Sequence, residues 1–153
     1  LRTVTSPLLP SVSAMPSRCC NPVPGDEIVG FVTRGRGVSI HRTDCINVIN
    51  LPEDERGRLI DAEWQVAENP TSTEQYSTEI QIFANNRIGL FADISKVFTE
   101  KQIDITSMNV RTSKQGRATI IMTFDIHGTE ELNRITDKIR QIDGVLDIQR
   151  TTG

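Results

Sequence analysis

This chain of 153 residues lacks the features that assign many proteins to a functional class. No apolar run approaches the roughly 20 residues of a membrane span, and no stretch joins a basic start to an apolar core as secretory signals do. The chain has no large excess of positive or negative charge, since 17 basic and 20 acidic residues leave a net charge of −3. We therefore expect a cytoplasmic module that contacts no membrane and has no bulk attraction to nucleic acid.

Thiol and imidazole groups are also scarce, yet most of them fall in one segment. The chain has three cysteines and two histidines, and four of these five residues are Cys19, Cys20, His41 and Cys45. A Cys19–Cys20 disulfide would be strained, because adjacent Cα atoms lie about 3.8 Å apart and disulfides need about 4.4 Å. Three thiolates and one imidazole satisfy a closed tetrahedral zinc site. The sequence predicts structural zinc, and it leaves open that the cysteines are small buried apolar residues.

Composition divides the chain into four parts, and because it begins with Leu1 rather than Met we expect a piece of a longer protein. Residues 1–16 hold three prolines and show no consistent period, which predicts a linker or disordered lead-in. Residues 17–66 form a small α/β unit rich in glycine turns, residues 67–75 are a polar linker, and residues 76–150 alternate strand and helix patterns. A unit of about fifty residues has a small core, so bound zinc would help to hold it together.

The last part has the pattern of an α+β domain. Ile80 and Ile82 alternate with polar residues as in a half-buried strand, and apolar residues at helical spacing follow Gly89. Two β-branched segments joined by a tight turn, a second helix and a closing strand complete the order βαββαβ. This is the ferredoxin-like arrangement, in which both helices cover one face of a sheet. Apolar side chains expected on the other face or at an edge favour a homodimer: Met108, Val110 and Ile121.

The segment ANNRIGLFADISKVFTEKQIDITSMNV, within residues 76–150, resembles an ACT domain, a small ligand-sensing module. The resemblance implies an amino-acid site at a dimer interface, where the first turn meets the first helix. A helix N-terminus presents unpaired N–H groups that suit a carboxylate, and glycine lets the backbone come close. Many ACT domains have aspartate and proline in this loop, where this chain has Asn85 and Ile88. The predicted ligand-binding residues are Asn86, Arg87, Ile88, Gly89, Leu90, Asn109 and Val110.

The segment CCNPVPGDEIVGFVTRGRGVSIHRTDCINV resembles the conserved-cysteine region that precedes an ACT domain in long RelA/SpoT-type enzymes, which make and degrade (p)ppGpp. The cysteine pair, the PGD turn, the TRGRG loop and the HRTDC ending carry the match. The resemblance implies the regulatory module of a bifunctional (p)ppGpp synthetase/hydrolase of the GTP pyrophosphokinase family, which senses amino-acid starvation in the stringent response. Its implied partners are the catalytic domains of the parent chain, the ribosome and stalled tRNA.

No catalytic residue and no catalytic cofactor are expected in this chain. A metal-dependent pyrophosphohydrolase needs a His/Asp constellation, and a pyrophosphate transferase needs a basic nucleotide cradle with acidic metal ligands. The chain has only two histidines, so the sequence gives no support for a pyrophosphohydrolase site. The glycines of TRGRGVS lie between expected strands rather than at a helix start, so they predict a hairpin turn and not a phosphate loop.

A local basic stretch accompanies the glycine loop: Arg34, Arg36 and Arg42. Taken with the resemblance, these arginines are predicted RNA contacts, because a guanidinium group binds phosphate oxygens in pairs. A solvated hairpin tip is the alternative interpretation. Two other functions stay open for the whole chain, an ACT domain of another amino-acid-controlled enzyme and a thiol redox module, although no C-x-x-C motif is present.

The segment before the cysteine pair departs from the resembled family. An apolar strand normally lies there, whereas this chain has SPLLPSVSAMPSR. Proline cannot donate to a strand ladder and fits a central strand poorly. The sequence therefore predicts that the first strand of the small unit is missing or replaced, and leaves open whether residues 17–66 fold fully.

Overall fold

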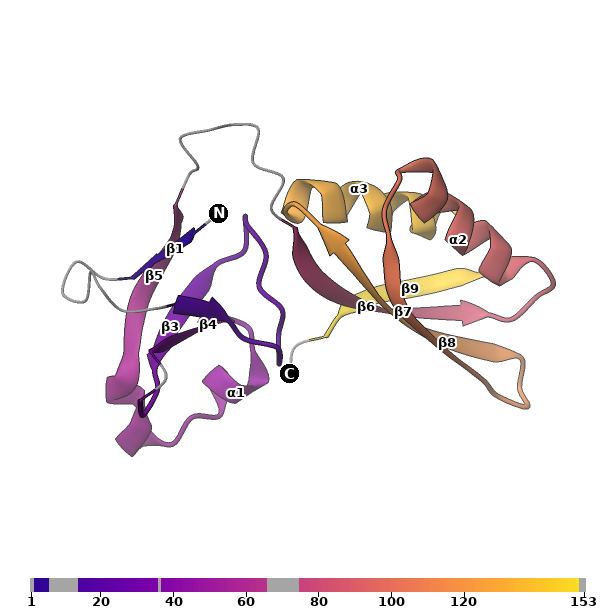
Figure 1. Cartoon of the computed structure of the whole chain (residues 1–153). Helices are drawn as coiled ribbons and strands as arrows, with labels where there is room; N and C mark the ends of the chain where they lie inside the picture. Colours follow the sequence, from indigo (N-terminus) through magenta and orange to yellow (C-terminus); the bar gives the residue numbers. More distant parts are fainter. Residues whose placement is uncertain (1, 6–13, 36, 66–74, 152–153) are drawn as a thin grey trace. The chain divides into compact units, whose positions relative to one another are not determined.

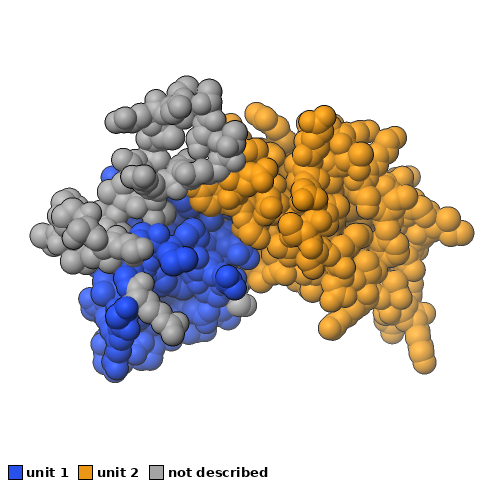
Figure 2. Space-filling view, viewed as in Figure 1, with its two compact units in different colours: residues 1–74, 152–153 blue, residues 75–151 orange. Residues whose placement is uncertain are grey.

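The structure, a computed structural model, describes residues 2–5, 14–35, 37–65 and 75–151. The chain divides into two compact units, which we call the first unit and the second unit (Figure 2). The first comprises residues 1–74 with 152–153, and the second comprises residues 75–151. None of the helices in the described ranges is long and apolar enough to cross a membrane.

The first unit is built on a five-stranded sheet with the strand order β1-β5-β3-β4-β2 (Figure 1). Its pairings are antiparallel except that between β2 and β4, which is parallel. A one-turn helix, α1, and a 3-10 helix, η1, follow β4. The elements are β1 (Arg2–Thr5), β2 (Ala14–Pro16), β3 (Ile28–Val32), β4 (Val38–Arg42), α1 (Ile46–Ile49), η1 (Glu53–Arg58) and β5 (Leu59–Gln65).

Part of the stretch expected to be a linker is strand, which corrects the prediction for residues 2–5 and 14–16. Strand β2 lies at one edge of the sheet, beside β4. Pro16 is tolerated there because an edge strand has a side on which no ladder hydrogen bond is needed. The other residues of the predicted linker, 1 and 6–13, lie outside the described residues, as do residues 66–74.

Strand β4 separates core side chains from polar ones by simple alternation. Val38 and Ile40 are buried on one face, while Ser39 and His41 are half-buried on the other. Gly30, on the neighbouring strand β3, leaves room for this core, because a Cβ there would lie 2.9 Å from side-chain carbons of Val38 and Ile60. The polar face of β4 thus becomes available for a site.

The second unit is a four-stranded antiparallel sheet with the order β7-β8-β6-β9 (Figure 1). Helices α2 and α3 lie side by side along one face of it. The chain order βαββαβ with this strand order is the ferredoxin-like fold, so the predicted fold class is confirmed. The elements are β6 (Tyr76–Asn85), α2 (Leu90–Glu100), β7 (Ile105–Thr112), β8 (Arg117–Ile126), α3 (Thr129–Arg140) and β9 (Val145–Arg150).

The core of the second unit lies between the sheet and the two helices. Strands β6 and β8 bury every second residue, and Phe98 of α2 meets Phe124 of β8 edge-on, with ring centroids 4.8 Å apart. Helices α2 and α3 each bury one stripe at helical spacing, as their sequence pattern predicts. The buried helix residues are Leu90, Ile94, Val97, Phe98, Leu132, Ile135, Thr136 and Ile139.

The apolar residues expected on the open face of the sheet are divided between its two faces. Met108 and Val110 of β7 lie opposite Met122 and Ile120, which are buried under the helices, and directly paired residues share a face. Both are nonetheless exposed, because β7 is an edge strand. Ile121 alternates with these positions and lies on the helix-free face, half-buried.

Candidate metal centre

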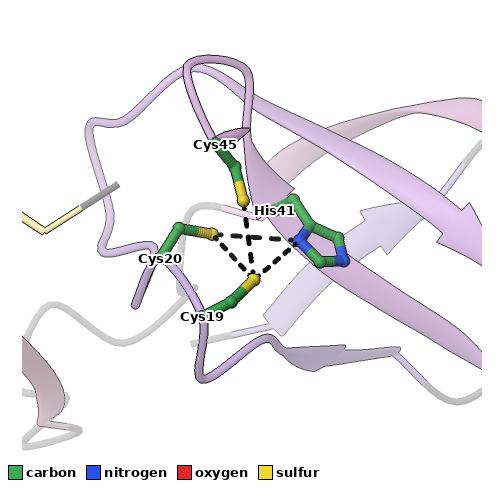
Figure 3. A group of neighbouring side chains, drawn as sticks. All are labelled: Cys19, Cys20, His41 and Cys45. Atoms are coloured by element: carbon green, nitrogen blue, oxygen red, sulfur yellow. Dashed lines mark hydrogen bonds between the residues drawn. The ribbon is translucent and has the colours of Figure 1, made fainter. Parts of the chain in front are cut away.

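Four residues predicted as zinc ligands meet in the first unit (Figure 3). Cys19 and Cys20 lie on a tight turn after β2, closed by the Asn21 N–H donating to the Ser17 carbonyl at 3.1 Å. Asn21 has a left-handed backbone, with φ of 48°, a conformation that asparagine tolerates better than most residues. His41 projects from β4, and Cys45 is the residue immediately before α1. Residues separated by more than twenty positions thus converge because the turn packs against the end of β4.

The separations between ligand atoms fit one tetrahedral ion. Cys19 Sγ lies 3.5 Å from Cys45 Sγ, 4.0 Å from Cys20 Sγ and 3.3 Å from His41 Nδ1. Cys20 Sγ lies 3.9 Å from His41 Nδ1, and all four ligand atoms lie within 4.8 Å of one another. Ligand atoms at about 2.0–2.3 Å from a shared tetrahedral zinc ion lie about 3.5–3.8 Å apart. The cluster therefore offers the ligand types that zinc binds, at separations that begin at 3.3 Å, do not exceed 4.8 Å and span the tetrahedral values.

Burial makes the cluster an unfavourable place for unpaired charge. It raises the pKa of Cys20 to about 12, although the Arg42 backbone N–H partly offsets this, and it raises the pKa of Cys45. Burial also opposes ionisation of Cys19, but hydrogen bonds from Ser17, Asn47 and neighbouring thiols outweigh it and lower its pKa. The pKa of His41 is lowered by burial, which favours the neutral imidazole that metals bind. A divalent cation would supply the positive charge that three adjacent thiolates need.

Arg42 belongs to the structure of this cluster. Its backbone N–H donates to Cys20 Sγ at 3.3 Å, and its guanidinium donates to the Cys20 carbonyl at 3.4 Å and to the Asp44 carboxylate at 2.5 Å. The residue is only 6% exposed. This burial is a correction to the prediction that Arg42 contacts RNA, since its guanidinium already holds the cysteine turn.

The other predicted RNA contacts lie in the loop between β3 and β4. Arg34 is exposed at its tip, beside Gly35, which has a φ of +84°. The loop is closed at its base by Thr33, whose backbone N–H and hydroxyl both donate to the Gly37 carbonyl, at 2.9 and 2.6 Å. Arg36 lies outside the described residues. The predicted hairpin turn is therefore present, with a cation projecting from it.

The predicted amino-acid site begins at the turn between β6 and α2. Gly89 has a φ of +84° and precedes the helix, and Ile88 is fully exposed, whereas the Leu90 side chain is buried in the core. The Arg87 guanidinium forms hydrogen bonds within the chain. It donates to the carbonyls of Asp143 and Ile88, at 2.9 and 3.1 Å, and to the Asp93 carboxylate at 2.7 Å. The turn is thus held by contacts of its own.

Asn109 and Val110 are not brought to this turn within one chain. Asn109 pairs with Ile121, which pairs with Gln81, five residues before Asn86. At about 3.3 Å per residue, the two asparagines are separated by about 16 Å along the strands, and by two strand spacings across them. A ligand that contacts both would need a second protomer.

Two serines near the cluster were missed in the sequence analysis. Ser17 Oγ lies 3.0 Å from Cys19 Sγ, and Ser39 Oγ lies 2.9 Å from His41 Nε2. The signal for Ser39 was present, because residues two apart on a strand share a face. Nothing in the sequence pattern indicated Ser17, whose position depends on the turn.

Two protein-family models match the chain in tandem. The RelA/SpoT RIS domain matches residues 10–65, and the ACT domain matches residues 72–150. Among solved structures, the solution structure of the ACT domain from GTP pyrophosphokinase of Chlorobium tepidum is 22% identical with a TM-score of 0.46. That alignment covers 52% of this chain and 89% of that one.

Curated relatives match across both units. A GTP pyrophosphokinase of Streptomyces coelicolor is 39% identical over 89% of this chain, and one of Escherichia coli K12 is 38% identical over 90%. The bifunctional (p)ppGpp synthase/hydrolase RelA of Mycobacterium tuberculosis is 37% identical over 97%. The matched parts are 16%, 18% and 20% of these proteins, so the chain spans a fifth or less of their length. By its two tandem domain matches and its similarity to these proteins along most of its length, the chain belongs to the RelA/SpoT family and corresponds to its regulatory C-terminal region.

Proposed function

We propose that this chain is the starvation-sensing module of a bifunctional (p)ppGpp synthetase/hydrolase, acting through contact with the ribosome and tRNA. The observation that carries the proposal is that the RelA/SpoT RIS domain match covers both the Cys₃His cluster and the arginine loop. GTP pyrophosphokinase and (p)ppGpp hydrolase activities belong to the parent protein in this proposal, carried by catalytic domains that this chain regulates. The module works in the cytoplasm, where ribosomes and nucleotides are found.

Zinc is the metal we propose for the cluster, in a structural role. Three cysteines and one histidine form a closed set of four ligands, so no position is left for a substrate or a reactive water. The ion would fix the cysteine turn and the start of α1 against β4, the strand that follows the arginine loop. Ribosome binding by this unit should accordingly depend on the metal.

The arginine loop gives the most direct test of the ribosome contact. Arg34→Glu should weaken cosedimentation of the 153-residue chain with ribosomes and reduce the dependence of binding on salt, because a phosphate contact releases counterions. Arg111→Glu makes the same charge change at an exposed position of the second unit and should have little effect. If Arg34→Glu binds ribosomes as well as the wild type, the arginine loop does not contact the ribosome. If the wild-type chain does not bind ribosomes, the proposed function itself is contradicted.

An amino acid and a second protomer are the partners we propose for the ACT domain. The turn around Gly89 supplies backbone N–H groups at a helix start, and the exposed β7 edge carries Met108 and Val110. Calorimetric titration of the chain with each of the twenty amino acids, and sedimentation equilibrium with and without any that bind, tests both proposals. Absence of heat for all twenty amino acids would refute the proposed ligand. A monomer at every concentration would refute the proposed dimer.

The two alternative functions have less support. An ACT domain of an unrelated metabolic enzyme would not need the RelA/SpoT RIS domain that matches residues 10–65. A thiol redox module would use the 3.5 Å approach of Cys19 and Cys45, but the same approach is expected of two zinc ligands. One equivalent of zinc in the purified chain favours the metal centre, and a Cys19–Cys45 disulfide in zinc-containing buffer favours the redox function.

A further inference from the structure

Ser39 is the side chain that touches the far side of the ligand His41. The two residues lie on the same face of β4, and Ser39 Oγ is 2.9 Å from His41 Nε2. The other ring nitrogen, Nδ1, points at the thiols, 3.3 Å from Cys19 Sγ and 3.9 Å from Cys20 Sγ (Figure 3). The imidazole therefore spans the space between the thiols and one hydroxyl group.

The chemistry of imidazole explains why the Ser39 hydroxyl matters for metal binding by His41. A neutral ring carries one proton, and the nitrogen that binds a metal must be the one without it. If Nδ1 is the ligand atom, the proton lies on Nε2, and that half-buried N–H needs an acceptor. Ser39 Oγ is placed to accept this hydrogen bond.

The hydroxyl can take up this role because its own proton has another acceptor. Ser39 Oγ lies 3.5 Å from the carbonyl oxygen of Phe31, its partner on strand β3. A serine hydroxyl rotates to suit its neighbours, with one proton to donate and two lone pairs to accept. With its proton directed towards Phe31, the hydroxyl presents a lone pair to His41.

We propose that Ser39 is a positioning residue of the metal centre: its hydroxyl accepts the His41 Nε2–H and holds the ring in the tautomer that presents Nδ1 to the ion. The inference rests on the proposed metal site and adds to it the identity of the coordinating nitrogen. Residues that orient metal-bound histidines in this way typically change metal affinity by about 10- to 100-fold.

The test uses the 153-residue chain with zinc and three variants. Zinc affinity is measured by competition with a chromophoric chelator, and long-range ¹H–¹⁵N correlation spectra of the zinc-loaded protein identify the protonated nitrogen of His41. Ser39→Ala removes the acceptor, Ser39→Thr retains a hydroxyl and suits a strand, and Ser77→Ala makes the same deletion on an exposed strand position of the second unit.

We expect the wild-type spectrum to show a proton on Nε2 and metal on Nδ1. Ser39→Ala should bind zinc about 10-fold more weakly, Ser39→Thr should recover most of the loss, and Ser77→Ala should match the wild type. Zinc bound at Nε2 in the wild type overturns the inference without any variant, as does unchanged affinity of Ser39→Ala. A wild-type chain that binds no zinc refutes the metal site and the inference together, so the two failures are distinguishable.

Discussion

The two units of this chain are similar in length but bury their side chains very differently. Among the described residues, and leaving proline aside, the first unit has five buried apolar side chains, two of which are the cluster cysteines Cys20 and Cys45. The second unit has sixteen, drawn from the sheet and both helices. A domain with few buried apolar groups generally needs a staple such as a metal or a disulfide. If the cluster binds zinc as proposed, the comparison predicts that the second unit is stabilised by its apolar core and the first unit mainly by its metal.

The chain provides one spectroscopic probe for each unit. Its single tryptophan, Trp64, lies in the first unit and donates its indole N–H to the Asp26 carbonyl at 3.1 Å. Its single tyrosine, Tyr76, begins the first strand of the second unit. Changes in the two units can therefore be followed separately in the same sample.

Removing one ligand should have the largest effect. Cys45→Ser should abolish the binding of one equivalent of zinc and lower the free energy of unfolding of the first unit by several kcal/mol, because structural zinc contributes folding free energy directly. The second unit should change by less than about 0.5 kcal/mol. Zinc content is measured by mass spectrometry and stability by urea denaturation with Trp64 fluorescence. Ile49→Ala, an exposed change on the same short helix, serves as the control. Equal stability of Cys45→Ser and the wild type would contradict the difference between the units.

Replacing a glycine of the second unit should destabilise that unit and leave the first unit unchanged. Gly144→Ala places a Cβ at a φ of +96° and 2.9 Å from the Asn85 carbonyl oxygen, so strain and a clash add together. We expect the second unit to lose about 2–4 kcal/mol and the zinc content to stay at one equivalent. Gly116→Ala separates the two causes, since its φ is +78° but nothing lies within 4 Å. It should cost about 1–2 kcal/mol. A loss of zinc from Gly144→Ala would show that the units depend on each other.

A buried hydroxyl in the second unit should be dispensable. Thr78 is fully buried, and its Oγ1 has no hydrogen-bond partner among the described residues. Thr78→Val keeps the shape and removes the unpaired group, so the second unit should gain about 1 kcal/mol in urea denaturation. Thr136→Val is the matched opposite, because its hydroxyl donates to the Asn133 carbonyl at 3.1 Å, and it should be destabilising. A loss of stability in Thr78→Val would contradict the prediction, because it would mean that the Thr78 hydroxyl forms a stabilising hydrogen bond.

The smallest effect concerns pH. Burial raises the pKa of the Tyr76 phenol above its ordinary value of 10.0, because the charged phenolate is poorly solvated there. The folded state then binds this proton more tightly than the unfolded state does. The contribution of Tyr76 to stability is therefore complete below pH 10 and is lost as the pH rises through the folded pKa. Phenolate absorbance should titrate at higher pH in the folded chain than in concentrated guanidinium chloride, and coincident titrations would count against burial of Tyr76.

Much of the second unit was predictable because its elements are encoded locally. The alternation at Ile80 and Ile82 and the stripe after Gly89 specify a strand and a helix within a few residues. The cluster was predictable for a different reason, since cysteine and histidine are so rare in this chain that four of them in one segment already point to a metal. Both predictions needed no knowledge of distant contacts.

What could not be predicted depends on contacts between distant residues. Strand β2 pairs with residues 38–40 of β4, and its own sequence, which ends in Pro16, gives no strand signal. Arg42 was predicted to contact RNA because it lies in the same basic stretch as the glycine loop, whereas the residue is buried and its guanidinium donates to the Cys20 carbonyl. Ser17 approaches Cys19 only because the chain turns after β2, which its sequence does not indicate.

Removal of the metal tests the central claim most directly. The zinc-loaded chain is treated with a strong chelator while Trp64 fluorescence and far-ultraviolet circular dichroism are recorded. If the cluster holds the first unit together, Trp64 should shift to the emission of a solvent-exposed indole, the second unit should keep its helices, and added zinc should restore the original signal. If Trp64 does not respond to complete loss of the metal, the first unit stands on its own core and the account is wrong.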